Sequence, residues 1–414
     1  MDCQQNIGLF NHLTQKGNLK NTRYGWLRLT PAHSVHLVSG LLDTHQEKHP
    51  VVLDPFCGTG TTVLVCAERG IESDTVDINP FLTWLTRTKT RSYKTTEIVN
   101  FKKAANLVVE EMLATEENGA WIPPLHQIEK WWDEQTLGFL SRAMRAINSL
   151  DKSISENVTD LLKLTFCRMM IERANVSFGH QSMSFKKCGI SNLPLFKSFE
   201  NETLTSWNQA IYTLSQSAES KLNSQPHILL CDARKLCTKL EPNRYTCVIT
   251  SPPYPNRMSY IRELRPYMYW LGYLQNAREA GELDWKAIGG TWGCATSRVG
   301  KWHPEYEIKI PYDGFHNILE EIAEKSDLLS RYIHKYFYDM KQHSSEIFSV
   351  VKPGGVIHYI VGNSKFYDVL LPVEAIFAGL FKSVGFVNVS IRTIRKRTSK
   401  KELFEFVVSA QKPV

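Results

Sequence analysis

The sequence predicts an α/β protein with an open, mostly parallel sheet, flanking helices and an inserted helical subdomain. Three observations predict this architecture. Short apolar runs typical of buried strands alternate with helical segments near both ends of the chain. Two of these runs end in distinctive loops, one with two glycines and one with two adjacent prolines. Over residues 97–224 the strand pattern stops, and apolar residues recur at helical spacing.

The composition is that of a globular protein with room for two or three domains in 414 residues. Its net charge of +7 permits a polyanionic partner without proving one. The nine cysteines form no C-x-x-C pair, so we expect reduced, buried thiols and no metal site. No basic-then-apolar leader and no long apolar stretch are present, so we expect a cytoplasmic protein without membrane contact.

The first distinctive loop follows a short predicted strand at 51–53 and precedes a predicted helix at 63–69. Residues 54–62 read Asp-Pro-Phe-Cys-Gly-Thr-Gly-Thr-Thr. Gly58 and Gly60 permit backbone angles and a close ligand approach that a side chain would prevent. Asp77 follows about twenty residues after the loop, where an acid can accept hydrogen bonds from ribose hydroxyls. This order of elements predicts a site for a nucleotide-type cofactor.

The second distinctive loop, residues 250–254, has the sequence Thr-Ser-Pro-Pro-Tyr and follows the apolar run 247–249. Pro253 has no amide hydrogen, and Pro252 restricts Ser251 to extended geometry, so the strand must end here. Alone, this loop is compatible with an ordinary proline turn. Ligands of open α/β sheets bind at the C-terminal edge of the strands, so the loop is also placed to present a hydroxyl, carbonyls and a ring to a ligand.

The other elements follow from their apolar patterns. Their expected ranges are helices at 35–42, 258–274, 315–350 and 373–384, strands at 227–231, 356–361, 386–394 and 403–410, and an irregular, glycine-rich stretch at 275–314. Inside the helical insertion, Trp121, Trp131 and Trp132 are expected to pack in a core rather than to stack on bases. Basic residues at the tip of the terminal hairpin fit either a solvated loop or a phosphate contact.

Together, the two loops resemble those of the amino-methylating DNA methyltransferases that use S-adenosylmethionine. Residues 54–61 are similar to their cofactor loop and residues 250–254 to their catalytic loop. The resemblance implies a class I methyltransferase fold, which is a Rossmann-like, seven-stranded mixed sheet with an antiparallel final strand. It assigns 25–95, 225–274 and 315–414 to the catalytic domain. It leaves 97–224 as the helical insertion and 275–314 as a candidate target-recognition region.

The resemblance also implies which residues form the site. Catalysis is assigned to Ser251, Pro252, Pro253 and Tyr254. Cofactor contacts are expected from Thr30, Pro31, Asp54, Pro55, Phe56, Gly58, Gly60, Thr61, Asp77, Ile78, Asp232, Ala233 and Thr250. DNA contacts are expected from Arg257, Tyr260, Arg262, Arg298, Lys301, Arg395, Lys396 and Arg397.

The residue types suit transfer of a methyl group to an amine. A base inside a duplex must first be flipped out, which costs on the order of a few kcal/mol, and stacking on Tyr254 would return about 1–3 kcal/mol. Ser251 and the Pro252 carbonyl could accept hydrogen bonds from the amine and direct its lone pair at the sulfonium methyl. Methylation at cytosine carbon-5 needs a cysteine in this loop, and the nearest one, Cys247, lies inside the strand.

In the resembled family, serine at the first position of the catalytic motif usually marks cytosine N4 methylation, whereas aspartate or asparagine usually marks adenine N6 methylation. The sequence therefore predicts a monomeric, site-specific cytosine-N4 methyltransferase of double-stranded DNA. Its partner would be a restriction endonuclease acting on the same site. An adenine-N6 enzyme, an RNA base methyltransferase and a non-catalytic nucleic-acid-binding protein remain alternatives.

Overall fold

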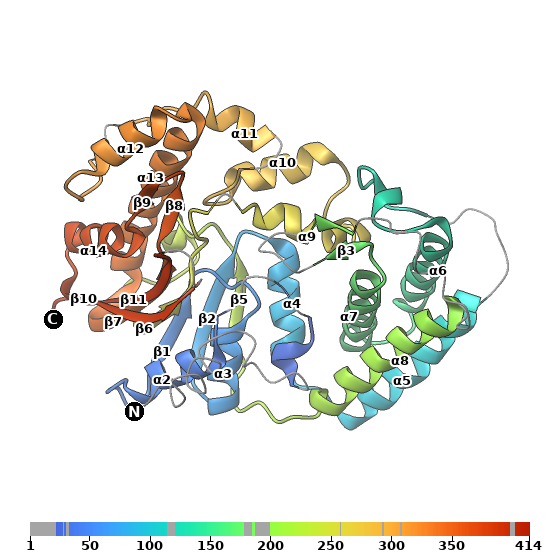
Figure 1. Cartoon of the computed structure of the whole chain (residues 1–414). Helices are drawn as coiled ribbons and strands as arrows, with labels where there is room; N and C mark the ends of the chain where they lie inside the picture. Colours follow the sequence, from blue (N-terminus) through green and yellow to red (C-terminus); the bar gives the residue numbers. More distant parts are fainter. Residues whose placement is uncertain are drawn as a thin grey trace, which may run out of the picture.

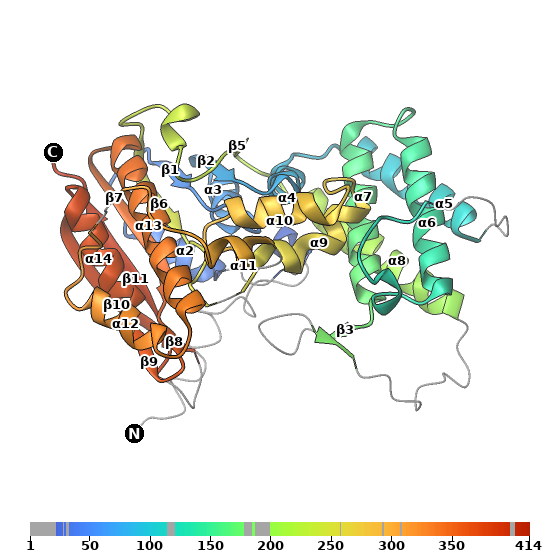
Figure 2. The same cartoon turned by 90° about the horizontal axis from the view of Figure 1, so that it is seen from above.

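The computed structural model describes residues 22–27, 29, 33–113, 121–177, 184–186, 199–256, 258–291, 294–306, 309–397 and 402–414. A twisted sheet with its covering helices forms one part of the molecule, and helices α5 to α8 form a second part beside it (Figure 1). Helices α9 and α10 lie between the two parts (Figure 2).

Seven strands form one sheet in the order β10-β11-β7-β6-β1-β2-β5. Their bounds are β1 Val51–Asp54, β2 Glu72–Asp77, β5 His227–Leu230, β6 Tyr245–Thr250, β7 Val351–Gly362, β10 Val387–Lys396 and β11 Phe404–Gln411. The five strands from β7 to β5 are parallel, whereas β11 runs antiparallel to both of its neighbours. The expected seven-stranded mixed sheet with an antiparallel final strand is confirmed.

The central strands are buried on both faces, which explains why they appear in the sequence as continuous apolar runs. Val52 and Ile249 pack in one core with helices α2 and α3, whereas Leu53 and Val248 pack in the opposite core with α13 and α14. Successive side chains alternate between the faces because a strand has a period of two residues. The bounds of these helices are α2 Val35–Asp43, α3 Thr61–Arg69, α13 Asp327–Val350 and α14 Val373–Val384.

The point at which the strand order reverses lies between β1 and β6. From β1 the chain moves outward through β2 to β5, and it then returns to place β6 on the other side of β1. The two strands are parallel, with Leu53 opposite Val248. Their C-terminal ends therefore bring the glycine loop and the double-proline loop together, at the kind of position where open α/β sheets bind ligands.

The predicted helical insertion consists of α5 Thr95–Leu113, α6 Glu134–Leu150, α7 Glu156–Glu172 and α8 Phe199–Ala218. Its core is continuous with α4 Pro80–Thr90 and with α9 Tyr260–Trp270, the helix that follows the double-proline loop. Trp131 and Trp132 are buried in this core, as expected. Trp121 is about half exposed, although one edge of its ring packs against Trp270.

A buried arginine ties the insertion to the sheet. The Arg23 guanidinium donates to the carbonyl oxygens of Lys89 at 2.9 Å and of Ala218 at 2.6 Å, so it joins the ends of α4 and α8. The Ser220 carbonyl is a further acceptor at 3.0 Å. Burial lowers the pKa of Arg23 to about 10, yet these carbonyl oxygens satisfy the charge where water cannot.

The helices differ from the expected ones in two places. The stretch 275–314 contains two helices, α10 Ala277–Lys286 and α11 Cys294–Val299, where an irregular segment was expected. The buried residues of helix α10 are Ala280, Gly281 and Asp284. Because these are small or charged, the sequence shows no stripe of large apolar residues that would predict the helix. The single helix expected over 315–350 is divided into α12 Phe315–Ala323 and α13, because Ser326 caps a new helix through the Leu329 amide.

Two short antiparallel strand pairs complete the fold. They are β3 Val176–Ser177 with β4 Ser184–Phe185, and β8 Ser364–Phe366 with β9 Val369–Leu371. Within the described ranges, no helix has both the length and the apolar character needed to span a bilayer.

The insertion offers a test of its own packing. Trp132 is 1% exposed and donates from Nε1 to the Met170 carbonyl at 2.9 Å, whereas Trp121 is 49% exposed. We expect Trp132→Ala to lower the free energy of unfolding by about 3–5 kcal/mol, because it leaves a cavity and an unpaired carbonyl. Trp121→Ala is the matched control and should cost far less in a denaturant titration. Equal losses in the two variants would contradict the described core.

Candidate active site

The two loops are joined by a buried hydrogen bond. Thr250 Oγ1 donates to Asp54 Oδ1 at 2.6 Å, and both residues are fully buried. The Phe56 amide donates to the same carboxylate oxygen at 3.1 Å. The Asp54 carboxylate therefore fixes the beginning of both loops from inside the protein, through its hydrogen bonds to Thr250 and to the Phe56 amide.

The glycine loop has the backbone geometry that its sequence predicts. Gly58 and Gly60 have φ angles of +52° and +74°, a region that residues with side chains rarely adopt. A Cβ on Gly60 would also lie only 2.7 Å from Thr86 Cγ2 on α4. The loop therefore packs tightly on α4 before α3 begins at Thr61.

Asp77 connects the end of β2 to this loop. Its Oδ2 accepts from the Gly58 amide at 3.1 Å, and its Oδ1 accepts from the Asn79 amide at 2.8 Å. Burial raises the pKa of Asp77 to about 6, against the effect of these backbone hydrogen bonds. Each carboxylate oxygen has a second lone pair, so Asp77 can still accept a hydrogen bond from a ligand hydroxyl.

A pocket that is partly open to solvent lies along the C-terminal edge of the strands. Seven of the predicted cofactor residues line it: Pro55, Phe56, Gly58, Asp77, Ile78, Asp232 and Ala233. Ser251, Pro252 and Pro253 of the predicted catalytic loop line it too, as does Tyr260. Asp54, Gly60, Thr61, Thr250 and Tyr254 do not line it, and Thr30, Pro31 and Arg257 lie outside the described residues.

One wall of the pocket was missed in the sequence. Asp284 and Lys286 of α10, followed by Ile288 and Gly290, line it beside the catalytic loop. The glycine at position 290 is the sequence signal for a close approach of two backbone segments. The structure explains it, because a Cβ on Gly290 would lie 1.7 Å from the Asp284 carbonyl oxygen. The stretch 275–314, expected to recognise the target, thus also forms part of the pocket.

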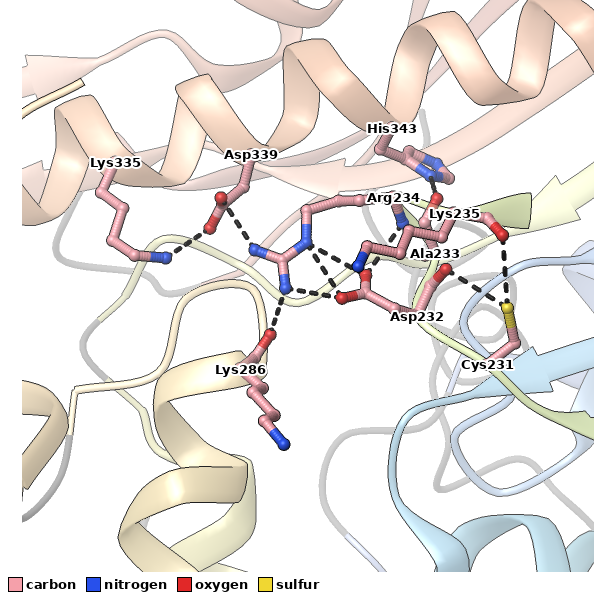
Figure 3. Close-up of polar contacts among 9 residues, drawn as sticks. All are labelled: Cys231, Asp232, Ala233, Arg234, Lys235, Lys286, Lys335, Asp339 and His343. Atoms are coloured by element: carbon pink, nitrogen blue, oxygen red, sulfur yellow. Dashed lines mark hydrogen bonds and ion pairs between the residues drawn. The ribbon is translucent and has the colours of Figure 1, made fainter. Parts of the chain in front are cut away.

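Figure 3 shows how Arg234 holds this wall in place. Its guanidinium pairs with Asp232 at 2.7 Å and with Asp339 of α13 at 2.9 Å, and it donates to the Lys286 carbonyl oxygen at 2.5 Å. Lys335 pairs with the other oxygen of Asp339 at 2.7 Å. One side chain therefore links the end of β5, the helix α13 and the C-terminal end of α10.

The same arginine controls the charge of Asp232. Burial alone would raise the pKa of this carboxyl, but hydrogen bonds and positive charge from Arg234 outweigh it and hold the pKa below its usual value. Asp232 is therefore a carboxylate whose position is fixed before any ligand binds. The sequence placed this acid at the correct strand end but gave no sign of its partner.

A buried histidine orients the neighbouring backbone. His343 Nδ1 lies 2.8 Å from the Ala233 carbonyl oxygen, and its Nε2 lies 2.6 Å from the Tyr359 hydroxyl. Burial lowers the pKa of His343 to about 4, so the ring is neutral at pH 7. Because a carbonyl only accepts, Nδ1 carries the hydrogen and Nε2 accepts from Tyr359.

The predicted catalytic loop is fixed by three hydrogen bonds. Ser251 Oγ donates to the Ile360 carbonyl oxygen at 3.2 Å, and the Tyr336 hydroxyl donates to the Pro253 carbonyl oxygen at 2.8 Å. The Tyr254 amide donates to the Tyr260 hydroxyl at 3.2 Å. Ser251 thus donates its hydrogen within the protein, so its oxygen can only accept a further hydrogen bond, and the residue lines the pocket.

The Tyr254 ring, expected to be open for stacking, is covered. It is 8% exposed, its hydroxyl donates to Glu405 at 2.9 Å, and the Arg397 guanidinium lies 5.3 Å from its centroid. Arg395 pairs with the same glutamate at 2.7 Å. The terminal hairpin therefore meets the catalytic loop through side chains as well as through the sheet.

The other predicted DNA-contacting residues are spread over the surface. Arg262, Lys301 and Lys396 are exposed, whereas Arg298 pairs with Glu282 and lies over the Trp285 ring. In the part of the chain that the structure describes, no group of three or more potential ligand side chains could hold a metal ion.

The sheet and its two loops define a class I methyltransferase fold. The chain is 22% identical over 396 residues to the type II methyltransferase M.AvaI of Nostoc, which covers 90% of this chain and 80% of that one. It is 21% identical to M.BsoBI of Geobacillus stearothermophilus, over 93% and 82% of the two chains, and 22% identical to M.MvaI of Kocuria varians, over 90% and 87%. The chain is thus similar to type II methyltransferases over most of its length, which confirms the predicted family resemblance.

No family model matches the chain. Among solved structures, a SAM-dependent methyltransferase of Methanosarcina mazei aligns with a TM-score of 0.32 and 10% identity, over 94% of this chain and 100% of that one. An rRNA methyltransferase of Streptomyces viridochromogenes aligns with a TM-score of 0.30 and 11% identity, over 92% and 86%. The fold assignment rests on the strand order and the loops.

The buried acid behind the loops predicts a pH effect. Burial raises the pKa of Asp54 to about 7, from about 4 for an ordinary aspartate, even though Thr250 and the Phe56 amide donate to it. The folded state then binds a proton on the Asp54 carboxyl more tightly than the unfolded chain does. The Asp54 contribution to the free energy of unfolding therefore falls as the pH rises from about 4 to about 7. We expect Asp54→Asn to gain stability relative to the unmodified protein as the pH rises from 5 to 8.

Melting temperatures measured across this pH range provide the test. Asp313→Asn, the same substitution at an exposed carboxylate, is the matched control for the effect of the substitution itself. A pH-independent difference for Asp54→Asn would show that the Asp54 carboxyl titrates normally.

Proposed function

We propose that this protein transfers a methyl group from S-adenosylmethionine to the exocyclic amine of a cytosine in DNA, forming N4-methylcytosine. Similarity to type II methyltransferases over 90% of the chain supports a DNA methyltransferase of the restriction-modification type. The observation that carries the proposal is the shared pocket, in which Ser251 and Pro252 lie beside the glycine loop and Asp77.

The pocket has the chemistry that this cofactor needs. Asp77 can accept from ribose hydroxyls, and Phe56 and Ile78 supply apolar surface for the adenine ring. Two acidic side chains, Asp77 and Asp232, favour a ligand with a positive charge. When bound there, S-adenosylmethionine supplies an electrophilic methyl group on its sulfonium centre.

The catalytic loop supplies two acceptors for an amine. Ser251 Oγ donates its own hydrogen to the Ile360 carbonyl oxygen, so its lone pairs can accept an N–H of the substrate. Among the described residues, no donor reaches the Pro252 carbonyl oxygen, which leaves it as the second acceptor. Two such bonds favour a tetrahedral nitrogen with its lone pair directed at the methyl group. After the N–C bond has formed, the nitrogen loses its extra proton to water, since a hydroxyl and a carbonyl hold the amine without taking up its proton.

The loop lacks the group that carbon-5 methylation requires. Cys247 lies in β6 and is fully buried, and burial raises the pKa of its thiol far above the usual range. A thiol in this state is a poor nucleophile. Attack by the substrate amine itself needs no covalent intermediate with the protein.

The decisive experiment is incubation of the purified protein with labelled S-adenosylmethionine and unmethylated bacterial genomic DNA, followed by nucleoside analysis. We expect label in N4-methylcytosine. Label in N6-methyladenine would replace cytosine with adenine as the substrate. Label that enters only RNA, in a parallel reaction, would overturn the assignment to DNA.

Two substitutions separate catalysis from cofactor binding. Ser251→Ala removes one acceptor and should lower kcat by about 10²-fold. Tyr254→Ala removes the predicted stacking surface and should lower transfer by roughly 10- to 100-fold. Tyr254→Phe is the matched control, since it keeps the ring and loses only the hydrogen bond to Glu405. Calorimetry should find S-adenosylmethionine affinity nearly unchanged in all three variants, and its loss in both alanine variants would move the target pocket elsewhere.

A further inference from the structure

We propose that Arg397 covers the ring of Tyr254 in the free protein and releases it to bind a DNA phosphate. The stacking face of Tyr254 would then become available only when DNA is engaged. This inference rests on the proposed function, and it gives Arg397 the role of a positioning residue that controls the catalytic loop.

The cover is built from specific contacts. The Arg397 guanidinium carbon lies 5.3 Å from the centroid of the Tyr254 ring, within the range of a cation–π interaction. The opposite end of the ring is anchored, because the Tyr254 hydroxyl donates to Glu405 at 2.9 Å. With 8% of the residue exposed, a base has no free face on which to stack.

Gly362 at the end of β7 makes room for both side chains. A Cβ at this position would lie 2.7 Å from Arg397 Nη1 and 3.0 Å from Tyr254 Cε2. Neither distance is compatible with a side chain unless the guanidinium or the ring moves. The covered arrangement therefore depends on Gly362, because the Tyr254 ring and the Arg397 guanidinium occupy the space that a side chain would need at this position.

The interactions that Arg397 makes in the free protein are weaker than those that a phosphate would offer. Its Nη1 donates to the Asn363 carbonyl oxygen at 3.1 Å, and within the described ranges no carboxylate pairs with it. Arg395, two residues earlier, is instead held by Glu405 at 2.7 Å. A phosphate offers two charge-assisted hydrogen bonds to a guanidinium, which a ring and a neutral carbonyl cannot match.

The position of Arg397 links DNA contact to the chemistry. It directly follows β10, and its neighbour Lys396 is exposed, so a nearby phosphate could attract both charges. Tyr254 belongs to the same short loop as Ser251, which lines the pocket. Withdrawal of one side chain therefore opens a ring three residues from the proposed amine acceptor.

Hydroxyl-radical footprinting of the free, full-length protein tests the cover without requiring any activity. We expect oxidation of Tyr254, measured by peptide mass spectrometry, to rise several-fold in Arg397→Ala and to stay low in Arg397→Lys, which keeps a cation. Lys396→Ala, which removes the same charge one residue away, should leave Tyr254 protected. Protection of Trp132 in every variant verifies that the fold is intact. Equal oxidation of Tyr254 in Arg397→Ala and the unmodified protein would overturn the proposal.

The salt dependence of binding to unmethylated genomic DNA tests the release. Loss of one phosphate contact should reduce the slope of log K against log salt by about 0.9 in Arg397→Ala, with the slope restored in Arg397→Lys. If Tyr254 becomes exposed in Arg397→Ala while the slope is unchanged, Arg397 only covers the ring and the release to phosphate is wrong. If the unmodified protein neither binds nor methylates DNA, the proposed function fails, while the footprint still reports on the cover.

Discussion

The hydrogen bond between Thr250 and Asp54 is the interaction on which the rest of the site depends. It crosses from β6 to β1, the two strands between which the strand order reverses, and it is fully buried. A buried carboxylate is costly unless donors satisfy it; Thr250 and the Phe56 amide both donate to Asp54 Oδ1, and burial still raises the pKa of Asp54 to about 7. The hydrogen bond nevertheless holds the predicted cofactor loop and the predicted catalytic loop in a fixed position relative to each other.

The core of the helical insertion continues to one wall of the pocket. Its core includes Leu264, Tyr267 and Trp270 of α9, the helix that follows the catalytic loop, and Leu264 also lines the pocket. Arg234 acts similarly on the neighbouring wall, since it connects α10 to Asp232 and to Asp339. The helical insertion therefore shapes the pocket through packing, and α10 does so through the hydrogen bond and ion pairs of Arg234.

Charge is distributed unevenly over the site. The acids Asp77 and Asp232 line the pocket, where their positions are fixed by backbone amides and by Arg234. Arginines collect on the side of the terminal hairpin, where Arg395 is neutralised by Glu405 and Arg397 lies over Tyr254. A cationic cofactor and a polyanionic substrate would thus each meet the opposite charge, which suits a reaction between the two.

The sequence by itself determined the sheet, the two loops and the helical insertion, because each has a local signature. Gly58, Gly60, Pro252 and Pro253 constrain their own backbone. Short apolar runs identified the central strands, and apolar residues at helical spacing identified the faces of α5 to α7. Only the tertiary structure decided that Asp54 supports the loops from behind, that α10 forms a pocket wall and that Arg397 covers Tyr254. These features depend on contacts between residues far apart in the chain, such as Arg234 with Asp339 and Tyr254 with Glu405. A single sequence has no local pattern that encodes such pairs, since they are set by how the elements pack.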